Sequence, residues 1–297
     1  VMTLVATRYP ASLGSVDGFA WPVTADDAAR AVDVFIDERL ASFGPFEDAM
    51  AVGAPELFHS LLSAPLNLGL LDPLALCRRV EAAYRAGAVP LASAEGFIRQ
   101  VLGWREFVRH VYEEHLAHYA TANALGADLP LPAWYWGEPS GMHCLDTTVA
   151  DVLARGYSHH ITRLMVLSNI ATLLGVEPQA LNRWFWEAYV DAYEWVVTPN
   201  VVGMATWADG GIVGSKPYVS SGKYIQRMGP SLCAGCRFNP AKTSGADACP
   251  LNHLYWDFLE RHRERLAKNV RMAVPLAALT KLPPAVMDDH REQAAVW

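Results

Sequence analysis

The sequence predicts an all-α fold, and three observations support that prediction. Apolar residues recur every three or four positions along most of the 297-residue chain, which is the period of a helix that buries one face. No run of alternating apolar and polar residues is long enough to build a sheet. The sequence also lacks an internal repeat, a G-x-G-x-x-G motif and a Walker loop, so a nucleotide cofactor would have to be held in a helical pocket.

The composition is that of an ordinary globular protein. With 52% hydrophobic and 19% charged residues, the chain can bury a large core in one domain or in two smaller ones. No apolar stretch reaches the ~18 residues of a membrane span, and the first residues lack a secretory leader, so we expect a cytoplasmic protein that contacts no membrane. A net charge of −7 argues against non-specific coating of nucleic acid but leaves room for a local basic groove.

The first helices are expected after a linker or extension at residues 1–24. One helix begins after Thr24, a favourable N-cap, and is broken by the Phe-Gly-Pro-Phe stretch at 43–46. A second covers Leu57 to Leu62 and ends in Ser-Ala-Pro. A third begins at Asp72-Pro73, because proline is favoured in the first turn of a helix.

The middle of the chain continues the helical pattern. A long helix is expected from Ala94 to Tyr119, and an aromatic-rich loop follows it. The residues Asp146-Thr147-Thr148 look like the cap of a helix that ends at Gly156. After Gly175, Pro178 starts a further helix, whose charged face, including Asp191, would ordinarily be a solvated ladder of ion pairs.

The central helix lies between the helix that ends at Gly156 and the helix that starts at Pro178, and it has polar residues at its start. Ser158 is a plausible N-cap, which places His160 and Arg163 within the first turn and a half. A helix start offers free N–H groups and a partial positive charge to an anion or to a polar cofactor edge. Ordinary capping histidines at 159 and 160 would give the same pattern, so these residues alone leave both interpretations open.

The cysteines form the most specific chemical signal. Cys233 and Cys236, at C-x-x-C spacing, can share one metal centre, and the following Cys249-Pro250 resembles the Cys-Pro that closes iron–sulfur ligand sets. Zinc is the competing metal, which spacing alone does not exclude. Cys144 is the better fourth ligand, because Cys77 lies within a helical apolar pattern typical of a buried thiol. An odd total of five cysteines suits metal ligation better than a disulfide framework.

Several motifs in order resemble one known family. Trp104-Arg105-Glu106-Phe107 resembles the W-R-E-F motif of this family. Residues 60–66 together with 69–73 resemble the family's phosphate-binding segment, and residues 221–227 resemble its G-x-Y-I-R segment. From about Thr24 to Pro284 the chain thus resembles the FAD-binding helical domain of the photolyase/cryptochrome family. The paired histidines and the four cysteines look like those of its prokaryotic iron–sulfur branch, whose members are (6-4) photolyases and related cryptochromes.

The resemblance implies a domain organisation. Residues 25–284 would form the helical FAD-binding and iron–sulfur domain, with a C-terminal tail at 285–297. Nothing in these residues resembles the N-terminal α/β antenna domain of the family, so the chain looks like the C-terminal part of a longer protein or a short form. An antenna pigment is expected only if such a domain exists, and the protein is expected to be a monomer.

The resemblance also implies the flavin contacts. Arg163 and Asp191 have the family spacing of an ion pair that clamps the flavin near its N5 edge, which would turn Asp191 toward the cofactor. Ser60 and Ser63 would bind the pyrophosphate, while a family tyrosine upstream is Phe46 here, so one phosphate hydroxyl is absent.

Further cofactor residues are implied less directly. Gln100 or Arg105 could reach the cofactor from the long helix. Asn200 is a candidate for contact with flavin N5, although the family spacing lands on Val197. The usual tryptophan triad cannot be traced, because its flavin-proximal position falls near Val201. Electron transfer is therefore expected through Trp184 and Trp136.

The chemistry implied is light-driven repair of DNA, in which reduced flavin gives an electron to a flipped-out pyrimidine lesion. A (6-4) lesion also needs a proton, for which His160 is the expected general acid, supported by His159. Asp48, Tyr218 and Tyr224 complete the expected lesion pocket. A phosphate-contacting rim could come from basic residues near the C-terminal third, namely Lys216, Lys223, Arg227, Arg237 and Lys242.

Three functions are compatible with the sequence. The leading hypothesis is a DNA photolyase with FAD and a [4Fe–4S] cluster, acting on damaged DNA and of the (6-4) type rather than the cyclobutane-dimer type. The alternative is a cryptochrome-type blue-light photoreceptor that repairs nothing. A further alternative is an iron–sulfur module that binds nucleic acid without flavin, like that of primase large subunits.

Overall fold

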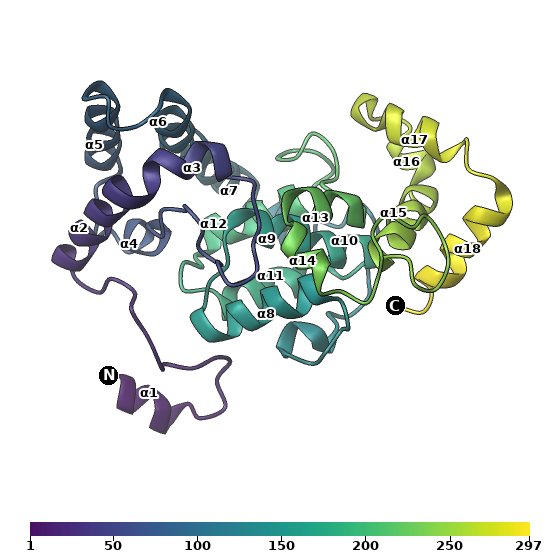
Figure 1. Ribbon diagram of the computed structural model, residues 1–297, viewed down its shortest axis with the longest axis horizontal. Helices are drawn as coiled ribbons and strands as arrows, with labels where there is room; N and C mark the ends of the chain where they lie inside the picture. The colour runs from purple at the N-terminus through teal and green to yellow at the C-terminus, as the bar shows by residue number, and fades with distance from the viewer.

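The computed structural model describes residues 1–297 and confirms the all-α prediction (Figure 1). Apart from two isolated β-bridges, Leu129 with Val176 and Asn239 with Ala248, the chain forms helices and loops. None of the helices combines the length and the apolar character that crossing a membrane would require.

The N-terminal part begins with a separate short helix and continues with a group of helices at one end of the molecule (Figure 1). The structured elements are α1 (Met2–Arg8), α2 (Ala25–Val34), η1 (Phe35–Arg39), α3 (Leu40–Phe46), α4 (Ser63–Asn67), α5 (Pro73–Arg85), α6 (Leu91–Ile98), η2 (Arg99–Trp104) and α7 (Arg105–Tyr119).

The middle of the chain forms the centre of the molecule (Figure 1). Its elements are η3 (Ala133–Trp136), α8 (His143–Arg155), α9 (His160–Thr162), η4 (Arg163–Ser168), α10 (Asn169–Leu174), α11 (Pro178–Ala188), α12 (Glu194–Thr198), η5 (Pro199–Ala205), α13 (Gly222–Met228) and α14 (Pro230–Ala234). The C-terminal part adds α15 (Pro250–Arg261), α16 (Arg263–Leu266), η6 (Val270–Met272), α17 (Ala273–Leu279) and α18 (Pro284–Ala294).

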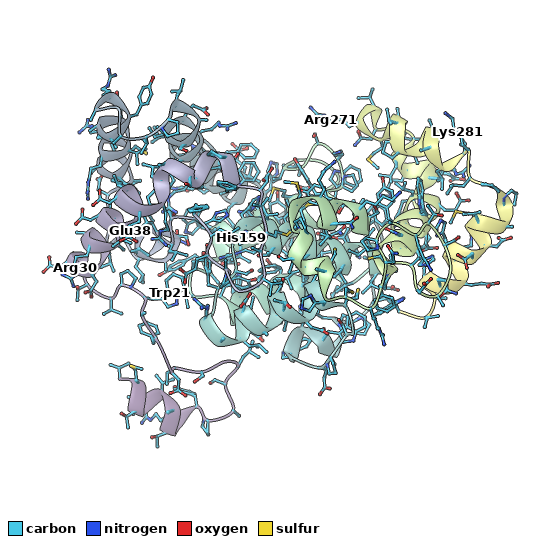
Figure 2. The ribbon with its side chains drawn as sticks, in the orientation of Figure 1. Trp21, Arg30, Glu38, His159, Arg271 and Lys281 are labelled. Atoms are coloured by element: carbon cyan, nitrogen blue, oxygen red, sulfur yellow. The ribbon has the colours of Figure 1, made fainter.

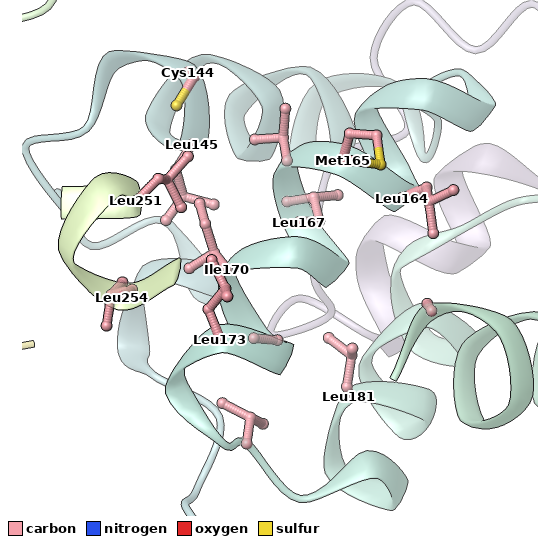
Figure 3. Packing of buried hydrophobic residues seen from close by; sticks show 14 of the residues in the cluster. Cys144, Leu145, Leu164, Met165, Leu167, Ile170, Leu173, Leu181, Leu251 and Leu254 are labelled. Atoms are coloured by element: carbon pink, nitrogen blue, oxygen red, sulfur yellow. The ribbon is translucent and has the colours of Figure 1, made fainter. Parts of the chain in front are cut away.

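Two hydrophobic cores hold these helices together. The smaller core lies among α2 to η2 and centres on Phe35, Phe43 and Phe97, whose rings contact one another. The main core surrounds the continuous helical segment α9–η4–α10, in which nearly every residue from Ile161 to Leu173 is buried. Figure 3 shows Leu residues of this segment packed against those of α8, α11 and α15. Each fully buried Leu or Ile stabilises the fold by about 1.5–3 kcal/mol.

Four segments are wound as π-helix, and three of them carry residues predicted to bind the cofactor. These are η2, which contains Gln100, η4, which begins at Arg163, and η5, which contains Asn200; the fourth is η1. Short π-helical turns occur frequently at functional sites.

Several helix boundaries confirm the sequence prediction. The side chain of Thr24 accepts a hydrogen bond from the backbone N–H of Asp27, and that of Asp72 accepts one from Ala75. Gly156 and Gly175 end their helices with φ of 63° and 92°, a left-handed conformation that costs glycine little. The expected helix from Ala94 to Tyr119 is present as the uninterrupted succession of α6, η2 and α7.

Other boundary predictions were wrong. Leu57 to Leu62 forms turns instead of a helix, and α4 begins at Ser63, where a helix was expected to end. The stretch 43–46 does not break its helix, since α3 includes Pro45. The N-cap of the central segment is His159, because the Ser158 hydroxyl instead forms a hydrogen bond with the hydroxyl of Tyr189.

Asp146 also has a different role from the one expected. It lies inside α8, which begins at His143, and does not precede it. Its carboxylate accepts hydrogen bonds from the backbone of Ser140 and Gly141 and from the Ser140 hydroxyl. It therefore fixes the turn that leads into the helix.

The two ends of the chain differ in how they contact the rest. No residue of α1 is buried, but Trp21 donates a hydrogen bond to the Arg155 carbonyl oxygen and its ring lies 5.4 Å from that of Tyr157 (Figure 2). Residues 285–297, expected as a tail, lie mostly in α18, which packs against α15 and buries Met287 and His290.

Candidate functional site

An ion pair between Arg163 and Asp191 lies at the centre of the candidate site. Arg163 begins η4, and Asp191 follows α11, so two elements of the main core position the pair. The guanidinium donates to both carboxylate oxygens, at 3.0 and 3.1 Å, in the bidentate arrangement typical of strong arginine–carboxylate pairs. The structure therefore brings together the two residues that the resemblance paired.

The surroundings of the pair hold it in one orientation. The Arg163 Nε–H donates to the carbonyl oxygen of Ser158 at 2.7 Å. The guanidinium carbon lies 4.2 Å from the ring centroid of Tyr189 and 5.2 Å from that of Tyr157, within range of cation–π attraction.

The two charges stabilise each other. Burial opposes the charge on each group, but the neighbouring carboxylate raises the pKa of Arg163 above its ordinary value. For Asp191, burial alone would raise the pKa; the Arg163 charge and the hydrogen bonds from Arg163 and Ser63 outweigh it and leave the pKa lowered.

The segment 60–67 contacts the same carboxylate. The Ser63 hydroxyl donates to Asp191 Oδ2 at 2.5 Å, and the Asn67 amide donates to the Asp191 carbonyl oxygen at 2.9 Å. The Ser60 hydroxyl, by contrast, accepts only a bond from the backbone N–H of Leu62 at 3.3 Å. Leu61 has φ of 60°, a strained value for a side chain of this size, and such strain is often stored at functional sites.

Two arginines flank this segment without an acidic partner. The Arg39 guanidinium donates to the Ser60 carbonyl oxygen at 3.4 Å, and its Nε–H is buried without any partner. Arg105 donates to the Asn67 side chain at 2.6 Å and stacks on the ring of Trp195, and burial lowers its pKa. Two partly buried guanidinium groups without a carboxylate could receive an anion.

Three histidines gather beside the ion pair. The rings of His59 and His159 are stacked, with centroids 4.6 Å apart and planes 12° apart, and Figure 2 shows His159 in the interior. His59 Nε2 and His159 Nδ1 are buried and have no hydrogen-bond partner. Burial, followed by the repulsion between these histidines, lowers the pKa of His59 to about 4 and of His159 to about 3. Both are therefore neutral at pH 7.

His160 faces outward, unlike His159. Its side chain is exposed at one edge, yet crowding by protein atoms and the charge of Arg163 lower its pKa, while Asp48 opposes that shift. Burial and the charge of Asp48 raise the pKa of Tyr224, and Arg227 opposes this. The charge of Asp48 thus acts on both His160 and Tyr224, two of the residues that the resemblance implies for a lesion pocket.

Some predicted residues make different contacts. Gln100 is exposed on η2 and has no side-chain hydrogen bond. Asn200 accepts a bond from the indole N–H of Trp104 at 3.0 Å and donates to the Val196 carbonyl oxygen. Tyr218 is half-buried and packs against the main core.

Of the two predicted electron-transfer tryptophans, Trp184 lies within a row of contacting aromatic rings, and Trp136 lies next to the end of that row in sequence. Trp184 is buried, and its ring lies 5.9 Å from that of Tyr189 and 5.1 Å from that of Tyr135. Trp136 follows Tyr135 in η3 and is 48% exposed. Since Tyr189 also contacts Arg163, aromatic contacts run from the ion pair through Trp184 to Tyr135, the sequence neighbour of the exposed Trp136.

All four predicted cysteine ligands line one small cavity. Cys144 comes from α8, Cys233 from α14, Cys236 from the loop after it, and Cys249 directly precedes α15. Burial, and then the proximity of the other thiols, raises the pKa of Cys144 and Cys233; burial also raises that of Cys249 to about 12. Cys77 lies apart, in the smaller core.

The close packing at this cavity requires a glycine. A Cβ atom on Gly222 would stand 2.5 Å from Cys249 Sγ, closer than any real contact allows. No three of the cysteine sulfurs lie within 4.8 Å of one another. Four thiolates on one zinc ion would lie about 3.8 Å apart, given Zn–S bonds of ~2.3 Å. The sulfurs are therefore more widely spaced than a zinc site.

Sequence reasoning missed His59, Arg39 and Asn67. His59 and Asn67 lie at the two ends of the phosphate-binding segment, so the motif could have drawn attention to them. Arg39 belongs to a different helix and contacts the segment only in the folded chain.

Comparison with known proteins relates this chain to photolyases and cryptochromes. No family model matches the chain. The fold resembles two solved structures. A bacterial class III photolyase from Agrobacterium tumefaciens matches with a TM-score of 0.56 and 20% identity over 91% of this chain. The Synechocystis sp. PCC6803 cryptochrome matches with a TM-score of 0.58 and 18% identity over 75% of this chain. The fold is therefore the helical fold that photolyases and cryptochromes share.

The sequence comparison agrees with the fold. The chain is 44% identical over 297 residues to a (6-4) photolyase of Agrobacterium fabrum, which is consistent with the photolyase/cryptochrome family. It spans 58% of the length of that relative, and 51% and 47% of the two solved chains. An uncharacterized protein of Acanthamoeba polyphaga mimivirus, R853, is 31% identical over 115 residues. The photolyase family implies FAD as cofactor.

Proposed function

We propose that this chain forms the FAD-binding and lesion-binding part of a photolyase that reverses (6-4) pyrimidine photoproducts in DNA under light. The observation that supports this best is the 44% identity, over the whole chain, to a protein named (6-4) photolyase. The exposed position of His160 beside Asp48 and Tyr224 suits a residue that must meet a lesion from outside.

The residues present fit FAD. Arg163 and Asp191 would hold the polar edge of the flavin ring, as their bidentate contact already fixes both side chains. Ser60 and Ser63 would bind the pyrophosphate, together with Arg39 and Arg105, the two guanidinium groups that lack an acid. Bound FAD, when reduced, supplies the electron that light drives into the lesion. Gln100 and Asn200 remain weaker candidates, because one is exposed and the other is bonded to Trp104.

His160 would deliver the proton that a (6-4) lesion needs. Its lowered pKa leaves the imidazole largely neutral in the free protein at pH 7. We expect bound DNA to raise that pKa, because phosphates add negative charge to that of Asp48. His159 is buried and stays neutral, so its part would be to pack behind His160 together with His59.

The DNA would lie over the surface around Tyr224. Tyr218 and Tyr224 offer aromatic contacts to a flipped-out lesion. Lys223 and Arg227 are exposed on α13 and could contact phosphates on either side of it. Lys242 is a weaker candidate, because it forms an ion pair with Asp247.

The flavin would receive electrons along the row of contacting aromatic side chains described above. Trp184 lies between Tyr189, beside the ion pair, and Tyr135, whose neighbour Trp136 reaches solvent. This arrangement supports the two tryptophans that the resemblance selected.

We further propose that Cys144, Cys233, Cys236 and Cys249 hold a [4Fe–4S] cluster with a structural role. Four thiols that line one cavity support this donor set. The ligands come from α8 and from the segment around α14 and α15, so the group would tie distant parts of the chain together, and closing long loops stabilises most in the chain-entropy model. Iron and acid-labile sulfide in equal, stoichiometric amounts would support the cluster; zinc without sulfide would refute it.

The function is tested by repair. Purified protein with its flavin, reduced and given blue light, should restore a synthetic oligonucleotide that contains one (6-4) photoproduct. Repair should stop in the dark. A yellow, light-reducible protein without any repair would instead support a cryptochrome-type photoreceptor, and a protein without flavin would refute both. We also propose that the protein acts as a monomer in the cytoplasm.

A further inference from the structure

A separate cluster of side chains that could hold a metal ion lies in the C-terminal helices, away from His59, His159 and His160. It joins His253 of α15 to Asp289 and His290 of α18, the helices that lie together at the C-terminal end in Figure 1. The loop between Cys236 and Cys249 covers it through Gly245. Nothing in the flavin chemistry uses these residues.

The three ligand atoms have the separations of a metal site. One atom from each residue lies within 4.8 Å of the other two. His253 Nδ1 is 3.1 Å from His290 Nδ1 and 3.9 Å from Asp289 Oδ2. Ligand atoms around a tetrahedral zinc ion, at bonds of ~2.0–2.1 Å, are about 3.3 Å apart. The observed distances bracket that value.

The atoms behind the ligands are arranged as in known metal sites. His253 Nε2 lies 3.2 Å from the Gly245 carbonyl oxygen, so its N–H can donate there and leave Nδ1 free as a ligand. The Gly245 N–H donates to Asp289 Oδ2 at 3.0 Å. Metal-bound histidines almost always donate their second N–H to a carbonyl or carboxylate oxygen, and bound carboxylates are hydrogen-bonded in turn. One glycine, with φ of 91°, thus orients two of the three ligands.

The site is closed by buried residues on one side and open to solvent on the other. His253 and His290 are buried, and His290 Nε2 is buried without a hydrogen-bond partner. Trp256 stacks on the His290 ring and fixes its plane. The Asp289 side chain is 29% exposed, which gives an ion a path from solvent and room for water as a fourth ligand.

We propose that His253, Asp289 and His290 bind a divalent transition metal of the zinc class. Two imidazoles and one carboxylate are the ligand types that this class prefers over magnesium or calcium. Bound metal would join α15, α18 and the Gly245 loop, and so hold the C-terminal helix and the segment between two cysteine ligands in place.

Zinc titration of the full chain, purified with its cofactors, tests the site. Asp289→Asn removes the exposed ligand while keeping an oxygen for Gly245, and Asp288→Asn is its matched control, since Asp288 is exposed and pairs with Arg291 instead. We expect Asp288→Asn to bind one more zinc ion per chain than Asp289→Asn, and zinc to raise the melting temperature only of wild type and Asp288→Asn. His290→Gln should behave like Asp289→Asn.

The difference between the two aspartate variants counts only this site, because any zinc taken up by the cysteines is the same in both. At least tenfold weaker zinc binding in Asp289→Asn supports the proposal. Equal zinc affinity and equal stabilisation in Asp289→Asn, Asp288→Asn and wild type would overturn it, and so would a wild-type protein that takes up no zinc.

Discussion

Replacing Asp191 by alanine is the most direct test of the ion pair. The change removes both acceptors of the Arg163 guanidinium and the acceptor of the Ser63 hydroxyl, and leaves Arg163 only its bond to the Ser158 carbonyl oxygen. Breaking a buried pair by removing one partner costs ~3–5 kcal/mol, because a buried charge is left uncompensated. The Arg163 side chain is 23% exposed and keeps its contacts with two tyrosine rings. We therefore expect a loss near the lower limit, about 3 kcal/mol.

Urea unfolding at pH 7 measures this loss as a change in the free energy of unfolding, and the flavin absorbance of the purified variant measures cofactor occupancy. Glu81→Ala is the control, since Glu81 pairs with Arg85 on the exposed surface of α5 and should cost less than about 1 kcal/mol. Both stability and FAD occupancy should fall in Asp191→Ala and stay unchanged in the control. Full FAD occupancy together with a stability loss no larger than that of Glu81→Ala would refute the assignment.

Three further predictions concern the histidines and cysteines. His160→Ala should keep flavin binding and photoreduction but lose repair of (6-4) lesions; undiminished repair excludes the general-acid role. Cys144→Ala should lose iron and give unstable protein, whereas Cys77→Ser should keep full iron content; iron retained in Cys144→Ala removes it from the ligand set. His59 and His159 have pKa values of about 4 and about 3 in the folded protein, so between pH 6.5 and 4 they bind protons mainly in the unfolded chain. The free energy of unfolding should therefore decrease as the pH is lowered through this range. At pH 5 the loss is about 2 kcal/mol for each histidine, and an acid-unfolding profile unaltered by His59→Gln would contradict this.

Local signals in the sequence predicted the fold wherever a boundary depends on one residue and its near neighbours. Thr24 and Asp72 cap their helices through bonds three residues along the chain, and Gly175 adopts the backbone that only glycine takes easily. The turns at 57–62 could not be predicted in this way. Their conformation depends on contacts of Ser60 with Arg39 and of His59 with His159, and the second of these partners lies far away in sequence.

The same distinction applies to the site. The pairing of Arg163 with Asp191 followed from a family spacing of 28 residues, and the geometry confirms it. The resemblance also named four cysteines that the fold brings to one cavity. His59 could not be found by periodicity, because its stacking partner lies 100 positions away and the two rings meet only when both cores have formed.

The π-helical winding of η4 has a consequence for insertions and deletions. A π-turn holds one more residue than an α-turn, and each residue of an α-helix advances the side chains by about 100° around the axis. Deleting one residue between positions 164 and 168 would let the segment return to α-winding. That deletion would leave the end that carries His160 and Arg163 facing almost as before, because the π-turn takes up its extra residue locally. α-Winding of the undeleted segment would instead rotate this end by about a quarter turn relative to the buried face of α10. The π-winding of η4 therefore sets the direction in which His160 and Arg163 face, independently of the apolar residues that bury the segment.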